Sequence, residues 1–263
     1  MSDDTPTADQ AASQPSDQAA NQASDQPRMQ IRLIPVTPLQ QNCSLIWNED
    51  TKHAAMVDPG GDVEQLMGAL EHFGLTLSKI WLTHGHMDHA GAAQELHERT
   101  GAPIEGPHKD DQWLLDMIEE SGAKYGIADG RNTTPQRYLE DGDTLELDDV
   151  TFDVSHTPGH TPGHVVIHNK DLKIAFVGDV LFRGSIGRTD FPRGDHEQLI
   201  ASITGKLWPL GPEMGFVPGH GPTSTFGIER VSNPFVADRL TGYGGTAKED
   251  GSEVDQKLSK RWT

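Results

Sequence analysis

Cysteine is almost absent from this chain, since Cys43 is the only one. A single cysteine excludes an internal disulfide and a cluster of metal-bound thiolates, and it fits a reducing compartment such as the cytoplasm. Nothing near Cys43 in the sequence would activate it as a thiol nucleophile. The G-x-S-x-G pattern of serine hydrolases is also absent. Neither common type of protein nucleophile is therefore expected.

Basic residues and long apolar runs are scarce as well. The chain has 21 Lys and Arg against 40 Asp and Glu, a formal charge of −19. Nucleic acids and anionic membranes both attract basic surfaces, so we expect neither as a partner. No apolar stretch approaches the roughly 20 residues of a membrane span. The sequence specifies no oligomeric state.

The two ends of the chain differ from its middle. Residues 1–28 contain no Val, Ile, Leu or aromatic residue, and carry five Asp but one basic residue. Such a segment buries too little apolar surface to fold, so we expect a disordered acidic leader. It lacks the basic start and apolar run of a signal peptide, which again predicts a cytoplasmic protein. One folded domain is expected over residues 29–240, followed by a polar tail over 241–263.

The middle of the chain alternates between two periodicities. Helical spacing of apolar residues occurs over 63–73, with Asp62 as the expected N-cap and Gly74 as the stop. Further helices are expected over 91–100, 111–120 and 195–207. Short β-type runs occupy residues 29–36, 43–48, 53–58, 79–83, 144–147, 150–156, 164–169, 172–178 and 214–218. This order predicts an α/β fold with two β-sheets packed as a sandwich and helices outside.

Histidine is unusually frequent, with 13 residues, and the first cluster is Thr-His-Gly-His-Met-Asp-His at 83–89. On extended chain His84 and His86 project to the same side. As the chain turns into a helix, Asp88 and His89 face the same point from the other direction. Gly85 allows close approach of the backbone. This geometry favours two adjacent cations over one.

Three further segments carry possible ligands at strand ends. In residues 156–164, two Pro-Gly turns fix the histidines; we expect His160 to be a ligand and His164 to orient a ligand or support the structure. Asp179 ends an apolar strand, where its carboxylate can bridge two cations. His220 lies between Gly and Pro residues in another rigid turn.

Two ligand sets follow from this placement. The first is His84, His86 and His160 with Asp179, and the second is Asp88, His89 and His220 with the same Asp179. Such all-nitrogen-and-oxygen sets suit two divalent ions, with zinc expected first and iron or manganese as alternatives. The remaining histidines are expected at the surface: His53, His72, His97, His108, His168 and His196.

Taken together, these motifs resemble the metallo-β-lactamase superfamily. The resemblance rests on VDPGGD at 57–62, THGHMDH at 83–89, TPGHTPGH at 157–164, GDVLF at 178–182 and GHGP at 219–222. It implies an αββα sandwich with two mixed sheets, external helices and two metals at the sheet edge. It also implies that Asp58 supports the metal-binding loop from beneath.

Residues 184–195 and the segment after residue 219 are similar to the bacterial glyoxalase II-like branch with a short C-terminus. That resemblance implies a small-molecule thioester substrate, S-D-lactoylglutathione, hydrolysed to D-lactate and glutathione by a hydroxide bridging two metals. Asp88 would both ligate and hold the attacking oxygen, and Arg188 would bind substrate. Asp190 stands where the branch has an aromatic residue, and Pro222 where it has a tyrosine, so glutathione recognition is expected to differ.

Other activities of the same superfamily remain open at this point. Persulfide dioxygenases share a G-R-T-D-F segment like that at 187–191 and use one iron bound by the equivalents of His84, His160 and Asp179. A lactonase or β-lactamase would use the same ligand sets. A binding protein with a structural metal is the alternative outside enzymes, and it would need no open coordination position.

Overall fold

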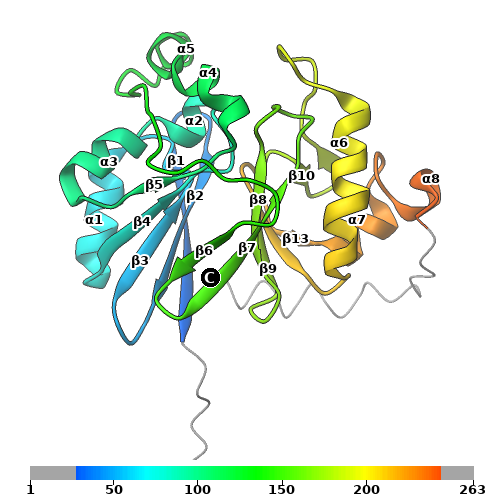
Figure 1. Cartoon of the computed structure of the whole chain (residues 1–263), viewed down its shortest axis with the longest axis horizontal. Coiled ribbons are helices and arrows are strands. Elements are labelled where there is room, and N and C mark those ends of the chain that lie inside the picture. Colours follow the sequence, from blue (N-terminus) through cyan, green and yellow to red (C-terminus); the bar gives the residue numbers. More distant parts are fainter. Residues whose placement is uncertain (1–27, 244–263) are drawn as a thin grey trace, which may run out of the picture.

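A computed structural model describes residues 28–243, and the expected leader and tail lie outside this range except for their innermost residues. Two large sheets form its centre (Figure 1). The first has the strand order β1 (Met29–Val36), β2 (Gln41–Asn48), β3 (His53–Val57), β4 (Thr76–Trp81) and β5 (Ile104–Glu105). The second runs β13 (Ser224–Thr225), β12 (Gly215–Pro218), β9 (Ile174–Gly178), β8 (Val165–Asn169), β7 (Val150–His156) and β6 (Thr144–Leu147).

Both sheets are mixed. In the first sheet β1, β2 and β3 pair antiparallel, whereas β3, β4 and β5 pair parallel. In the second sheet only the β12–β9 pair is parallel. A small hairpin of β10 (Leu181–Phe182) and β11 (Ser185–Ile186) follows β9. The predicted mixed two-sheet sandwich is confirmed.

Helices cover the outer faces of the sandwich. Figure 1 shows α1 (Val63–Phe73) and α3 (Ala93–Thr100) beside the first sheet, and α6 (His196–Ser202) beside the second. The short helices α4 (Gln112–Leu115) and α5 (Ile118–Tyr125) lie above the strands in this view. The other helices are α2 (Met87–Ala90), α7 (Phe226–Ser232) and α8 (Asp238–Thr241), with 3-10 turns at Lys109–Asp111 and Trp208–Leu210 and a π-turn at Ile203–Leu207.

The core follows from side chains that alternate between the two faces of each strand. In β3, Ala54 and Met56 pack toward the helices, whereas Ala55 and Val57 pack between the sheets. In β8, Val166 packs against the α6 side, and its neighbours in the strand pack between the sheets. Strands buried on both faces are continuous apolar runs, which is why the sequence pattern identified them.

Asp62 occupies the predicted N-cap position of α1 without capping it through its side chain, and one other local expectation was wrong. Helix α1 spans the predicted residues and ends at Gly74, whose φ of 66° suits glycine. The Asp62 side chain, however, makes no capping hydrogen bond, because its Oδ2 accepts the backbone N–H of Thr37 at 2.6 Å. The helix expected over 111–120 is instead a 3-10 turn followed by α4 and α5.

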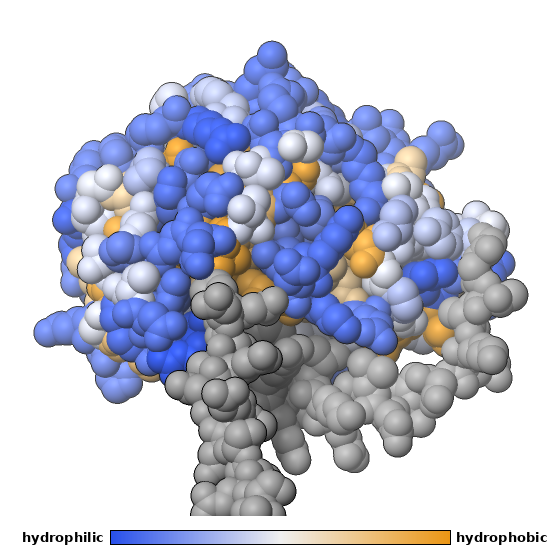
Figure 2. All heavy atoms as spheres, turned by 60° about the horizontal axis from the view of Figure 1, so that its bottom comes forward, coloured by the Kyte–Doolittle hydropathy of each residue, from blue (hydrophilic) through white to orange (hydrophobic). Residues whose placement is uncertain are grey.

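The next feature is the distribution of apolar residues over long helices and over the surface. Among residues 28–243, no helix is long and apolar enough to cross a bilayer. Figure 2 shows mostly hydrophilic side chains, with scattered apolar ones, on the visible part of the face at the bottom of Figure 1. A large apolar surface on this visible area is therefore absent.

Candidate metal centre

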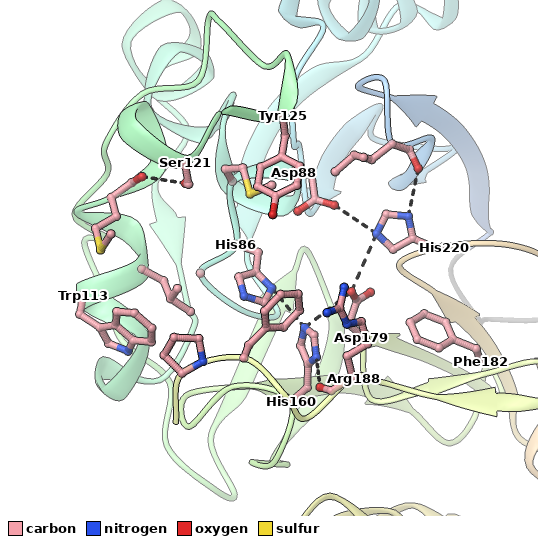
Figure 3. Close-up of a pocket in the computed structure, with 17 residues that line it drawn as sticks. His86, Asp88, Trp113, Ser121, Tyr125, His160, Asp179, Phe182, Arg188 and His220 are labelled. Carbon is pink, nitrogen blue, oxygen red and sulfur yellow. Dashed lines mark hydrogen bonds and ion pairs between the residues drawn. The ribbon is translucent and has the colours of Figure 1, made fainter. Parts of the chain in front are cut away.

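The structure brings together all seven side chains proposed as metal ligands. They follow the carboxyl ends of β4, β7, β9 and β12, the positions at which loops of α/β sheets build sites. Figure 3 shows several of them facing one another at one end of a pocket. The full set is His84, His86, Asp88, His89, His160, Asp179 and His220.

The first group consists of three imidazole nitrogens. His86 Nδ1 lies 3.0 Å from His84 Nε2 and 3.1 Å from His160 Nε2. His84 and His160 are buried, and His86 is half-buried. Burial lowers the pKa of all three, and that of His86 falls to about 3. Three neutral imidazoles whose nitrogens converge on one point have the character of a transition-metal ligand set.

Two of these rings, those of His160 and His84, are oriented by what their other nitrogen touches. His160 Nδ1 donates to the Arg188 carbonyl oxygen at 2.8 Å, which leaves Nε2 free to face the site. His84 Nδ1 lies 3.1 Å from the Thr83 hydroxyl, which itself donates to Asp58. Such outer hydrogen bonds fix the tautomer of a ligating histidine.

The second group combines two carboxylates with two imidazoles. Asp88 Oδ2 lies 3.1 Å from His220 Nε2 and 3.9 Å from His89 Nε2. His220 Nδ1 donates to the Leu39 carbonyl oxygen, so its Nε2 faces inward. Gly219 makes this arrangement possible, because a Cβ at that position would lie 2.2 Å from Asp179 Oδ1.

Asp179 lies between the two groups. Its Oδ1 is 3.4 Å from His89 Nε2, and its Oδ2 is 3.7 Å from His160 Nε2 and 3.8 Å from His220 Nε2. Among the described residues, Asp179 Oδ1 and His89 Nε2 are buried without a hydrogen-bond partner. Buried polar atoms are normally satisfied, so these orphaned ligand-type atoms fit a site for cations.

The electrostatics of this second group are those of carboxylates held ionised. Burial opposes the charge of Asp88 and Asp179, yet the neighbouring His89 keeps both pKa values below the ordinary range. His89 and His220 respond in the opposite direction: burial lowers their pKa values, but Asp179 and Asp88 raise them above the ordinary value. With both imidazoles neutral, as metal ligands must be, the two carboxylates would give the donor set a net negative charge that suits divalent cations.

Asp58 and His164, expected to act behind the ligands, do lie there. Asp58 is buried; its Oδ1 accepts the Thr83 backbone N–H at 2.7 Å, and its Oδ2 lies 2.9 Å from His89 Nδ1. His164 Nε2 accepts the backbone N–H of Asp179 at 3.1 Å. Asp58 therefore orients His89, and His164 holds the backbone of Asp179.

One buried carboxylate was missed by the sequence analysis. Asp111 is fully buried, and its Oδ2 accepts the Gly85 backbone N–H at 3.0 Å and the Thr161 hydroxyl at 2.7 Å. Its Oδ1 accepts the Gly163 backbone N–H at 2.6 Å. Burial nevertheless raises the pKa of Asp111 to about 6. This side chain ties the loop that carries His84 and His86 to the loop that carries His160.

A pocket of about 530 Å³ opens over the candidate centre. Figure 3 shows Trp113 at the left of it, Tyr125 at the top and Phe182 at the right. Arg188 lines the pocket as expected for a substrate-binding residue. Its guanidinium is already paired with Asp190, through Nε at 2.9 Å and a second nitrogen at 2.8 Å.

Two histidines expected at the surface are buried. His108 is 7% exposed, stacks on His156 with ring centroids 4.4 Å apart, and bonds Glu140 at 3.0 Å. His168 is 4% exposed and lies 3.0 Å from the Ser155 hydroxyl. A histidine within an apolar strand, as at position 168, was the signal that burial should be expected.

The comparisons with known proteins agree with this fold and donor set. The family model described as the metallo-beta-lactamase superfamily matches residues 36–227, so the chain belongs to this superfamily. Together with the donor set, this membership defines a metal-dependent hydrolase.

Individual relatives indicate which branch of the superfamily the chain resembles. It is 47% identical over 209 residues to a Haemophilus influenzae protein named hydroxyacylglutathione hydrolase GloC, covering 79% of this chain and 98% of the relative. The predicted glyoxalase II-like branch is thereby confirmed. The structure of the BLEG-1 B3 metallo-beta-lactamase superposes with a TM-score of 0.73 at 38% identity, covering 78% of this chain and 99% of that one. A di-iron-bound form of TTHA1623 gives 0.69 at 37% identity, covering 77% and 98%.

Proposed function

We propose that this chain is a thioester hydrolase that uses two divalent cations and converts S-D-lactoylglutathione to D-lactate and glutathione. The observation that carries the proposal is the pair of donor groups that share Asp179 at one end of the pocket. The 47% identical relative named hydroxyacylglutathione hydrolase supports this choice of substrate. The catalytic domain is proposed to span residues 29–240.

In this proposal His84, His86 and His160 hold one cation, and Asp88, His89 and His220 hold the other. Asp179 contributes to both, which its 3.4–3.8 Å distances to His89, His160 and His220 support. The donor atoms suit zinc, iron or manganese. Zinc is proposed first, and the di-iron form of a relative supports iron as the alternative.

Bound divalent cations supply Lewis-acid chemistry, since they lower the pKa of water and polarise a carbonyl. The chain supplies orientation and proton handling. Asp88 stays ionised in its buried position, so its carboxylate can accept a hydrogen bond from the attacking water and then its proton. The leaving group is a thiolate, whose ordinary pKa near 8.5 makes a dedicated general acid unnecessary.

The surrounding residues hold this arrangement in place. Asp58 and His164 position His89 and Asp179 through the hydrogen bonds described above. Arg188 is proposed to bind a carboxylate of glutathione at the pocket, and it would have to exchange its partner Asp190 to do so.

The test is thiol release from S-D-lactoylglutathione by the purified chain, with metal content measured on the same sample. Turnover that requires about two metals per chain supports the proposal. One iron per chain, with oxygen uptake on glutathione persulfide and no thioester cleavage, would contradict it and favour the dioxygenase alternative.

A further inference from the structure

Beyond the donor atoms, the pocket has two apolar walls. One comes from α4 and α5 and contains Trp113, Leu114, Met117 and Tyr125. The second comes from β10 and the loop after β11, with Phe182, Phe191 and Pro192, and Leu39 and Met87 complete the apolar lining. Figure 3 shows Trp113 to the left and Phe182 to the right of His86 and His160.

These walls carry few polar groups, and one of them, Trp113 Nε1, is buried without a hydrogen-bond partner in the described part of the chain. The Ser121 hydroxyl donates to the Met117 carbonyl oxygen at 2.7 Å, within its own helix. The Trp113 ring is backed by the Arg193 guanidinium, 4.6 Å from its centroid, which holds the indole as a flat wall. This part of the pocket therefore offers a ligand apolar contact and few hydrogen bonds.

Half of the exposed large hydrophobic residues described line this pocket. Leu39 is 39% exposed, Met117 40% and Tyr125 54%. Within residues 28–243, three other large hydrophobic residues reach such exposure, Val231, Phe235 and Leu240, and none of them lines this pocket. Apolar side chains gathered around a cavity are typical of a surface that a ligand covers.

The charged side chains that line the pocket also favour an apolar ligand. Arg188 is the one Lys or Arg side chain in the described lining, and its bidentate pair with Asp190 compensates its charge. It also packs over the Phe191 ring, 4.3 Å from the centroid. A site with one compensated cation and two apolar walls is suited to a ligand with substantial apolar surface.

We propose that this pocket selects thioesters that carry a large apolar group, such as an aromatic ring, next to the thioester. The inference rests on the proposed thioesterase activity and names its substrate class. The ring would lie against the apolar side chains of Trp113, Tyr125 and Phe191 that line the pocket. The small polar lactoyl group would leave these walls in contact with water.

Binding can be measured without any chemistry by using thioethers, which cannot be hydrolysed. Isothermal titration calorimetry of the metal-containing full chain would compare S-benzylglutathione with S-methylglutathione. Because burying a ring of this size contributes about 1.5–3 kcal/mol, the benzyl compound should bind at least about tenfold more tightly. Tyr125→Ala should reduce this preference about threefold or more, and exposure of Tyr125 makes misfolding of the variant unexpected.

Phe235→Ala is the matched control. Phe235 is 46% exposed and lies outside the pocket, so its removal should leave the preference unchanged. Equal affinities for the two thioethers, or equal effects of the two variants, would overturn the proposal.

Hydrolysis then shows which side of the thioester carries the ring. For the acyl side, kcat/KM for S-mandeloylglutathione is divided by kcat/KM for S-lactoylglutathione. For the thiol side, kcat/KM for the lactate thioester of benzyl mercaptan is divided by kcat/KM for the lactate thioester of glutathione. A ratio of about ten or more on either side supports the proposal, and ratios near one on both sides overturn it. Absence of all hydrolysis would refute the thioesterase activity, while the thioether affinities would still decide whether the pocket selects apolar groups.

Discussion

Deleting one hydroxyl group should show how strongly Asp111 ties the two histidine loops together. Thr161 is buried, and its hydroxyl donates to Asp111 Oδ2 at 2.7 Å. Thr161→Val removes this donor while keeping the shape of the side chain. Hydrogen bonds to charged groups contribute about 1.5–3 kcal/mol, so we expect the free energy of unfolding to fall by about 2 kcal/mol.

The assay is urea and thermal unfolding of metal-free protein at pH 8, where bound cations do not add to stability by mass action. For a domain of this size a loss of 2 kcal/mol corresponds to a Tm lower by about 4–8 °C. Thr161→Ser is the control because it keeps the hydroxyl and loses a methyl group, which costs about 1 kcal/mol. Unfolding of the Val variant within about 0.5 kcal/mol of wild type, or equal losses in both variants, would refute the reasoning.

Three further predictions concern pH, substrate charge and metal. Burial lowers the pKa of His168 in the folded chain, so as the pH falls the unfolded chain takes up this proton before the folded chain does. The free energy of unfolding therefore falls as the pH drops below about 6.5. His168→Gln should lose less of this free energy than wild type between pH 7 and pH 5. Arg188→Ala should raise KM for S-D-lactoylglutathione with little change in kcat, whereas Asp190→Asn should lower it by freeing the guanidinium. Chelation should abolish thioester hydrolysis without unfolding the chain, and added zinc should restore it.

Each of these predictions has a result that contradicts it. An identical pH dependence of stability in wild type and His168→Gln would show that the His168 ring titrates normally. Unchanged KM in both Arg188→Ala and Asp190→Asn would remove the arginine from substrate binding. Loss of secondary structure on chelation, followed by circular dichroism, would assign the cations a structural role.

The convergence of the candidate metal ligands could be predicted because its information is local. His84, His86, Asp88 and His89 lie within six residues at the end of an apolar strand, and strand geometry decides which way they project. The four consecutive strands from Thr144 to Gly178 were equally predictable, because β6 and β7 alternate between buried and exposed residues whereas β8 and β9 are continuously buried runs.

What escaped prediction depends on distant partners. Asp111 accepts hydrogen bonds from residues 26 and 52 positions away, and no feature of its neighbouring sequence indicates either. His108 is buried against Glu140, 32 positions further along. The side chain of Asp62 also has a distant partner. Its carboxylate accepts the backbone N–H of Thr37, 25 residues earlier, instead of an N–H in the first turn of α1.

The most direct test of the account is the release of glutathione from S-D-lactoylglutathione by wild type, His86→Ala and His72→Ala under the same conditions. His86 contributes a nitrogen 3.0 Å from His84 and 3.1 Å from His160, whereas His72 is an exposed residue of α1. The account predicts turnover by wild type and His72→Ala, and at least about a hundredfold loss in a folded His86→Ala. Equal turnover in all three proteins, or none in metal-loaded wild type, would contradict it.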